Sequence, residues 1–122
     1  MGKVEVVRVY DDEGRSGSPG HEFRVLVDRL WPRGVKKEAL DIDEWAKDVA
    51  PSTELRRWYG HEPERFDEFS KRYRSELDAE PAAGALQSLR KEKSRRRVVL
   101  LTATKDVPRS GAEVLRQVLS GR

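Results

Sequence analysis

The sequence Val98-Val99-Leu100-Leu101 decides the fold, because four apolar side chains follow one another with no polar residue between them. Successive side chains of a β-strand point to opposite faces of its sheet. A strand of this composition therefore buries both faces, which is typical of parallel sheets that are covered by helices. The stretch predicts a central strand of an α/β domain.

Two stretches upstream have the short, apolar and β-branched composition of strands, Val4–Tyr10 and Phe23–Leu30. The connection between them, residues 11–22, is rich in glycine and is expected to be a loop. Its two serines, Ser16 and Ser18, lack the pattern of a nucleophile elbow and are interpreted as loop residues. The connection is long enough for a parallel crossover or for a long hairpin, so the relative direction of the two strands stays open.

Helices are predicted between the second strand and the last one, and again after the last one. Asp41 or Asp43 is expected to cap a short helix that carries Trp45. Ser52 is expected to cap the next helix, which Gly60 ends. Three later segments repeat apolar residues at helical spacing, and these are Phe66, Phe69, Tyr73 and Leu77, then Leu86 and Leu89, then Ala112, Leu115, Val118 and Leu119.

This order of elements predicts an α/β fold, with a small, mainly parallel sheet of about three strands flanked by helices. The chain has 122 residues, which is room for one hydrophobic core. No repeat and no linker divides it, so a single domain over residues 1–122 is expected.

The composition excludes several kinds of site. The absence of cysteine excludes disulfides, thiolate nucleophiles and iron–sulfur clusters, and two histidines are too few for a His-rich metal centre. An all-carboxylate site of the magnesium type stays open, but no spacing of carboxylates demands one, so no metal and no cofactor are expected. Charged residues make up 39% of the chain while the net charge is only +3, as on an ordinary soluble surface. No apolar run of about 20 residues and no signal-peptide core is found, so we expect a cytoplasmic protein without membrane contact; the oligomeric state is left open.

The residues that leave the strand ends are the candidates for a binding site, because ligands of open α/β sheets bind beyond the carboxyl ends of the strands. Arginine and lysine at such a place suit phosphate or carboxylate groups. The sequence therefore predicts binding of a small anionic molecule. The candidate ligand-binding residues are Tyr10, Arg29, Trp31, Arg33, Lys105, Asp106 and Ser110.

Two further residues, Asp28 and His61, are candidates for catalysis. Asp28 leaves the second strand, and the imidazole of His61 titrates near neutral pH. Structural roles are open for both, since Asp28 can pair with Arg29 and His61 can make a turn contact. Trp31 is large enough to belong simply to the core. Whether the protein is an enzyme is left open.

Two other classes of function remain as alternatives. Residues 90–97 contain six basic residues and one acidic residue, which suits contact with nucleic-acid phosphates. No aromatic residue for base stacking interrupts this run, and cations are favourable at the C-terminus of a helix, so a solvated helix end is the favoured interpretation. The remaining alternative is a non-catalytic interaction module.

One long motif carries a family resemblance. It reads Val25-Leu26-Val27-Asp28-Arg29-Leu30-Trp31-Pro32-Arg33-Gly34, and Ala50-Pro51-Ser52-Thr53-Glu54-Leu55-Arg56, Trp58, Gly60-His61 and Pro63 follow it in register. These residues closely resemble the YeaO-like branch of the domain of unknown function 488, and the match runs nearly end to end. The resemblance implies a small α/β sandwich with a mainly parallel sheet, in a bacterial type of cytoplasm, and it implies no established activity.

The chain departs from this family at one place. Members tend to follow the last strand with a Lys-Asp pair and then with an Asn-His pair that opens the final helix. Lys105 and Asp106 are present here, but Ser110 and Gly111 stand at the Asn-His positions. A histidine that did chemistry in relatives would thus be missing, while Ser110 and the backbone of Gly111 could still bind an anion.

Overall fold

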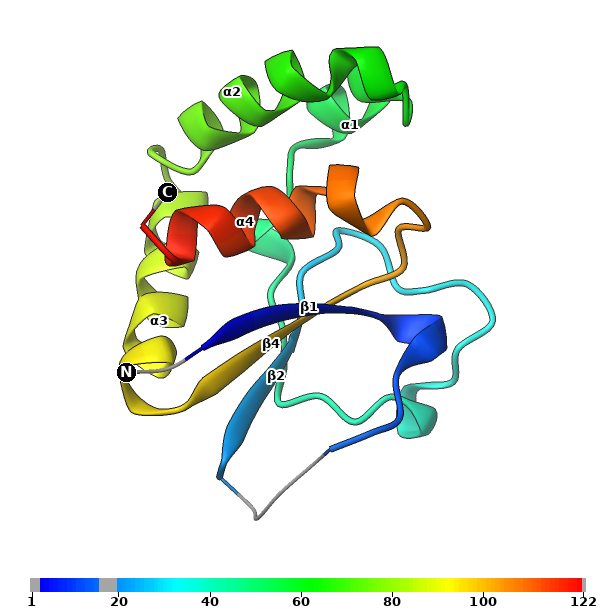
Figure 1. Ribbon diagram of the computed structural model, residues 1–122, viewed down its shortest axis with the longest axis vertical. Helices are drawn as coiled ribbons and strands as arrows, with labels where there is room; N and C mark the ends of the chain where they lie inside the picture. Colours follow the sequence, from blue (N-terminus) through cyan, green and yellow to red (C-terminus); the bar gives the residue numbers. More distant parts are fainter. Residues whose placement is uncertain (1–2, 16–19, 122) are drawn as a thin grey trace.

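The computed structural model of the chain describes residues 3–15 and 20–121, so Ser16 and Ser18 lie outside the described residues. The strands in these parts are β1 (Val4–Arg8), β2 (Glu22–Leu26), β3 (Glu44–Trp45) and β4 (Arg97–Thr102). They form one sheet in the order β1-β4-β2-β3. Figure 1 shows β4 between β1 and β2. All neighbouring strands are parallel, which confirms the α/β fold with a parallel sheet.

The stretch that decided the fold lies in β4, in the middle of the sheet. Its side chains are 0% exposed at Val98, Leu100 and Leu101 and 1% exposed at Val99. Val98 and Leu100 join the core under the helices, whereas Val99 and Leu101 join a smaller cluster on the opposite face. The prediction of a strand buried on both faces is confirmed.

The direction of the two upstream strands is settled by β4, which lies between them. Because β1 and β2 both pair with β4 in parallel, they are parallel to each other, and the hairpin alternative is wrong. Both are shorter than expected. A 3-10 turn over Val9–Asp11 ends β1, and β2 ends at Leu26, although the backbone N–H of Val27 still donates to the carbonyl of Leu101 (3.1 Å).

The predicted short helix around Trp45 is wrong, since Glu44–Trp45 forms the edge strand β3. The backbone N–H of Asp43 donates to the carbonyl of Arg24 (2.7 Å), and the N–H of Ala46 donates to that of Leu26 (2.9 Å). These contacts with β2 pull the segment into the sheet, which gives four strands in the described residues in place of about three. Two residues are too few to reveal the twofold periodicity of a strand.

The described α-helices are α1 (Thr53–Tyr59), α2 (Phe66–Glu76), α3 (Ala82–Arg95) and α4 (Gly111–Leu119). The predicted start and end of α1 are confirmed. The hydroxyl of Ser52 accepts a hydrogen bond from the N–H of Leu55 (3.1 Å), and Gly60 ends the helix in the left-handed region at φ +53°.

The helices cover one face of the sheet in two layers. Helices α3 and α4 contact the strands directly, while α2 packs on α4 and α1 packs on α2 (Figure 1). Phe69, Tyr73 and Leu77 are buried between these layers, and Phe66 is partly buried. None of the four described α-helices lies over the other face (Figure 1); the segment 27–43 contributes Trp31, Leu40 and other apolar side chains to the cluster there.

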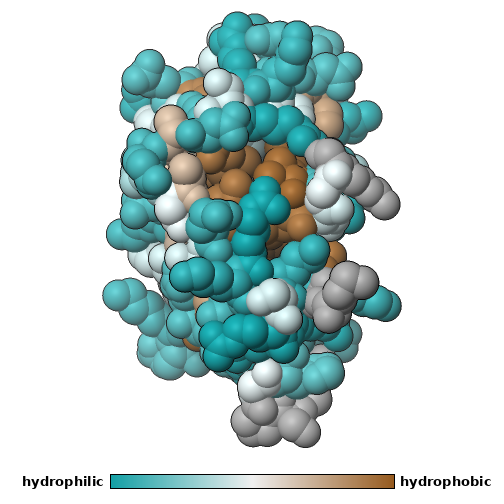
Figure 2. All heavy atoms as spheres, turned by 90° about the vertical axis from the view of Figure 1, so that its left-hand side faces the viewer, coloured by the Kyte–Doolittle hydropathy of each residue, from teal (hydrophilic) through white to brown (hydrophobic). Residues whose placement is uncertain are grey.

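The surface seen in Figure 2 is mostly polar, as the high charge content leads one to expect. Figure 2 shows the face on the left of Figure 1, where hydrophilic side chains surround one central apolar area. Partly buried apolar side chains that pack against the core under the helices include Val4, Val118 and Ala85. None of the helices in residues 3–15 and 20–121 has the length and apolar character needed to cross a bilayer.

Candidate functional site

A cavity of about 920 Å³ opens at the carboxyl ends of β2 and β4, where the sheet meets α1 and the start of α4. The predicted site residues all line it, and these are Tyr10, Asp28, Arg29, Trp31, Arg33, His61, Lys105, Asp106 and Ser110. The cavity is also lined by Pro51, Arg56, Tyr59, Phe69, Thr102 and Thr104. Residues far apart in the sequence therefore meet at one place, which lies where parallel strands bring their ends together.

Asp28 follows β2 directly and lies against the end of β4. Its carboxylate accepts hydrogen bonds from the hydroxyl of Thr102 (2.7 Å) and from the backbone N–H of Ala103 (2.7 Å). Burial raises the pKa of the Asp28 carboxyl, while these two hydrogen bonds and the charge of Arg56 oppose the rise. The carboxylate ties the two central strands together and also faces the cavity.

The hydroxyls of Thr102 and Thr104 extend this arrangement along the wall of the cavity. They lie 3.2 Å apart, and the backbone N–H of Thr104 also approaches the Thr102 hydroxyl oxygen at 3.2 Å. An ionised carboxylate only accepts hydrogen bonds, so the single proton of the Thr102 hydroxyl points to Asp28. The proton between the two hydroxyls must then come from Thr104, whose oxygen keeps acceptor capacity.

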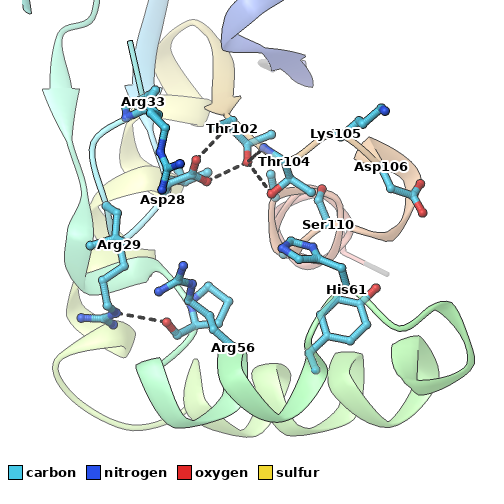
Figure 3. A pocket seen from close by; sticks show the side chains of 18 of the residues that line it. Asp28, Arg29, Arg33, Arg56, His61, Thr102, Thr104, Lys105, Asp106 and Ser110 are labelled. Atoms are coloured by element: carbon cyan, nitrogen blue, oxygen red, sulfur yellow. Dashed lines mark hydrogen bonds between the residues drawn. The ribbon is translucent and has the colours of Figure 1, made fainter. Parts of the chain in front are cut away.

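Arg29 does not pair with Asp28. Its Nε donates to the carbonyl of Pro51 (3.1 Å; dashed in Figure 3), and its Nη2 donates to the carbonyl of Ala50 (3.1 Å). The guanidinium thus joins the end of β2 to the segment that leads into α1. Carbonyl oxygens accept from two of its five N–H donors, and they do not neutralise its charge.

Aromatic side chains hold the segment after β2 in place. The hydroxyl of Tyr10 donates to the carbonyl of Arg33 (2.8 Å), and the indole N–H of Trp31 donates to the carbonyl of Val35 (2.6 Å). The ring of Trp31 meets that of Trp45 edge to face at 5.3 Å between centroids. Tyr10 and Trp31 therefore shape this wall of the cavity, and Trp31 also belongs to the apolar cluster under the sheet.

Three of the predicted residues come from the segment after β4. Asp106 forms an ion pair with Arg109 (3.1 Å), and Lys105 points away from Asp28 in Figure 3. The hydroxyl of Ser110 accepts from the N–H of Glu113 (3.1 Å) and donates to the carbonyl of Val107 (2.7 Å). Ser110 is therefore the N-cap of α4, and its one hydroxyl proton is already engaged.

His61 lies at the edge of the cavity in an unusual backbone conformation. It follows Gly60 and has φ +58°, the one non-glycine residue with positive φ in the described part of the chain. The side chain is exposed, and its ring lies 6.3 Å from that of Tyr59 between centroids. In Figure 3 the imidazole is directed toward the space beside Ser110 and Thr104.

Arg56, on α1, lines the same cavity, and reasoning from the sequence missed it. Its side chain forms no hydrogen bond or ion pair with any described residue, and in Figure 3 it rises from the helix toward Asp28. Recognition of strand β3 in the sequence could have identified Arg56 as a residue of the site. A parallel strand at residues 44–45 would have placed the following segment, up to α1, at the same edge of the sheet.

The charges that line the cavity are unbalanced. Four basic side chains lie in its wall, Arg29, Arg33, Arg56 and Lys105, against two carboxylates. Within residues 3–15 and 20–121, none of the four has a carboxylate oxygen within 4.0 Å. The same residues hold no group of three or more histidine, aspartate or glutamate side chains that could bind a metal ion.

Curated relatives match this chain over most of its length. An uncharacterized protein of Mycobacterium tuberculosis (strain ATCC 25618 / H37Rv) is 51% identical over 120 residues, which cover 98% of this chain and 96% of that protein. The uncharacterized protein YeaO of Escherichia coli (strain K12) is 45% identical over 74 residues, which cover 61% of each chain. No solved structure matches the chain.

A family model spans nearly the whole chain as well. It is described as the inactive DUF488-N3 subclade and matches residues 3–122. This range includes both central strands and every residue of the cavity wall. The chain therefore belongs to the YeaO-like DUF488 family, within the subclade described as inactive.

Proposed function

We propose that this protein binds a small anionic molecule, carrying a phosphate or carboxylate group, in the cavity at the carboxyl ends of β2 and β4. The observation that carries the proposal is the set of four cations in the cavity wall that have no carboxylate partner among the described residues. Cations gathered in one cleft repel one another and attract an anion.

The two carboxylates of the wall do not balance these cations. Asp28 accepts hydrogen bonds from Thr102 and Ala103, and Asp106 is paired with Arg109, which lies outside the wall. An anionic ligand would supply the missing negative charge. The volume of about 920 Å³ lies within the range of pockets that hold small molecules and cofactors.

Arg56 is the principal anion-binding group of the proposal. All five N–H donors of its guanidinium are free of partners in the described structure, and the planar fork suits a bidentate contact with phosphate or carboxylate. Arg29 contributes charge from a fixed position, since carbonyl oxygens hold its side chain. Arg33 and Lys105 are exposed and add attraction at the rim.

The proposed activity is binding, without a chemical step. The subclade of the chain is described as inactive, and the Ser110 hydroxyl serves as a helix cap. In this proposal Asp28 and His61 recognise the ligand by hydrogen bonds. The protein works in the cytoplasm as a single domain over residues 1–122.

The nucleic-acid alternative is weaker, because part of the basic run is used inside the molecule. Arg96 pairs with Glu92 (2.9 Å) and lies over the ring of Phe23 at 5.1 Å, and Arg97 pairs with Glu5. These contacts favour the structural interpretation of residues 90–97.

The test compares two neighbouring arginines of α1. Arg56 lines the cavity and Arg57 does not, although both are exposed. Ribose 5-phosphate is titrated into the wild type, Arg56→Gln and Arg57→Gln by calorimetry, with thermal melting in parallel. We expect Arg56→Gln to weaken binding about tenfold or more, and Arg57→Gln to leave it within about twofold.

Melting of the unliganded variants controls for loss of fold. Ligand at about 100 times its dissociation constant should stabilise the wild type by about 2.7 kcal/mol. Equal weakening by both substitutions, or no binding of the probe to the wild type, would overturn the proposal.

A further inference from the structure

The cavity offers hydrogen-bond acceptors beside its cations. Asp28 lies at the junction of the two central strands, with each of its oxygens already accepting one hydrogen bond from the protein. Two carboxylate oxygens have about four acceptor sites in total, so each keeps one for a ligand. This residual capacity has no use in binding an anion, which would be repelled by the carboxylate.

Thr104 adds a further acceptor next to this carboxylate. Its hydroxyl proton is directed to Thr102, since the proton of Thr102 points to Asp28. The free lone pair of the Thr104 oxygen and the two oxygens of Asp28 therefore belong to one hydrogen-bonded chain, in which every proton is oriented toward the carboxylate. This wall can accept hydrogen bonds from a ligand, and the cations can bind the anionic group of the same ligand.

The hydrogen-bond donors of such a ligand should be neutral groups, because charged donors would be repelled by the cations of the wall. A ligand ammonium group near Asp28 would also lie among Arg29, Arg33 and Arg56, which line the same cavity. Repulsion from these three would offset the attraction of one carboxylate. Neutral N–H groups on a flat ring avoid this repulsion, and Trp31 and Tyr59 provide aromatic rings in the wall.

We propose that the ligand combines its anionic group with a neutral planar ring carrying two adjacent N–H donors, which Asp28 accepts as a bidentate pair while the arginines hold the anion. The inference rests on the proposed function and names the chemical class of its ligand. Guanine nucleotides have this pattern, since the N1–H and the 2-amino group of guanine are adjacent donors. Adenine presents an acceptor beside its amino group, and that acceptor would face the carboxylate.

The experiment measures four probes by calorimetry on the full chain: guanosine, inosine and adenosine 5′-monophosphates and ribose 5-phosphate. We expect the guanosine compound to bind about tenfold or more tightly than the adenosine compound, as for other bidentate contacts with a base edge. Inosine monophosphate lacks the 2-amino group and should bind with intermediate affinity. Ribose 5-phosphate reports the anion contact alone.

Two variants test whether the preference for the guanosine compound depends on Asp28. Asp28→Asn should bring the guanosine and adenosine compounds to within about threefold of each other, because an amide offers one donor and one acceptor. Asp67→Asn changes an exposed carboxylate of α2 that does not line the cavity and should keep the preference. If Asp28→Asn does not fold, the order of the four probes on the wild type decides alone.

The outcomes separate the two proposals. Equal binding of all four probes, or tighter binding of the adenosine compound, overturns this inference and leaves the binding of a small anion standing. A preference that survives in Asp28→Asn also overturns it. If ribose 5-phosphate does not bind, the proposed function is overturned, and this inference is overturned with it.

Discussion

At the scale of single residues, Arg29 shows how a charged group at a strand end serves the fold and the site together. Its two hydrogen bonds go to the carbonyls of Ala50 and Pro51, both of which are buried residues. A buried carbonyl that loses its donor costs free energy, since water does not replace the bond. The side chain therefore fixes the segment that leads into α1, the helix that carries Arg56.

We predict that Arg29→Lys lowers the free energy of unfolding by about 1–3 kcal/mol, because a lysine cannot reach both carbonyls with the geometry of the guanidinium fork. Urea denaturation measures the loss. Arg33→Ala is the control, because it changes another arginine of the cavity wall four residues further along the chain. Arg33 is exposed and has no ion pair within the described residues, so this change should stay within about 0.5 kcal/mol. An equal loss in both variants would contradict the prediction.

The second prediction for a single residue concerns Arg15 and the dependence of stability on pH. It bonds to both oxygens of Asp41 (3.0 and 3.2 Å) and of Asp43 (3.2 Å each). The hydrogen bond from Arg15 lowers the pKa of the Asp41 carboxyl. Burial acts to raise the pKa of the Asp43 carboxyl, but hydrogen bonds from Arg24 and Arg15 leave that pKa below its ordinary value of 3.8.

Because both carboxyls have lowered pKa values in the folded state, their contribution to stability is present above about pH 4 and is lost as the pH falls through the folded pKa values. Arg15→Gln should therefore be less stable than the wild type at about pH 6, and the difference should shrink toward about pH 2.5. Urea midpoints at the two pH values measure it. A difference of the same size at both would show that Arg15 acts through packing alone.

At the scale of elements, α2 joins the two helical layers through one aromatic column. The ring of Phe69 lies 4.2 Å from that of Tyr59 and 5.9 Å from that of Tyr73 between centroids, and the residue is 2% exposed. Phe69 also lines the cavity, so this column supports the wall from behind.

We predict that Phe69→Ala lowers the free energy of unfolding by about 3–5 kcal/mol, as expected when a large buried side chain leaves a void. Asp67→Ala on the same helix is the control, since Asp67 is exposed and should change the stability by less than about 1 kcal/mol. Chemical denaturation measures both. A loss below about 1 kcal/mol for Phe69→Ala would mean that the column carries little of the packing energy.

At the scale of the whole molecule, the positive charge is divided between the cavity and the surface. The net charge of +3 is small, and two of the six basic residues in the run at 90–97, Arg96 and Arg97, are engaged with Glu92, Glu5 and Phe23. The exposed basic side chains that remain in this run form a cationic surface, which would bind nucleic acid without regard to its base sequence. Such a surface binds nucleic acid through counterion release, which salt weakens steeply.

We predict that any binding to duplex DNA is weak and disappears at physiological salt. The triple variant Arg90→Gln, Lys91→Gln, Arg95→Gln should abolish it at low salt while the melting temperature stays unchanged, because all three side chains are exposed. Fluorescence anisotropy at two salt concentrations measures the binding. Sequence-specific binding that persists at physiological salt would instead favour the nucleic-acid alternative.

The sequence by itself determined those features that depend on local pattern. The unbroken apolar run at Val98–Leu101 predicted the central strand, and the capping residue Ser52 together with Gly60 predicted α1. The candidate site was located by the rule that ligands of open α/β sheets bind beyond the carboxyl ends of the strands. The nine residues predicted from these strand ends and from the neighbouring turns line one cavity. These predictions rest on periodicity and on backbone preferences, which act over a few neighbouring residues.

Only the tertiary structure decided which segments pair and which polar groups meet. Glu44–Trp45 is a strand because β2 lies beside it, and Arg56 belongs to the cavity because β3 carries the chain back to that edge. Asp28 bonds to Thr102, 74 residues away along the chain, and not to its neighbour Arg29. Such contacts depend on the register between distant strands, and the local sequence of either partner does not contain that register.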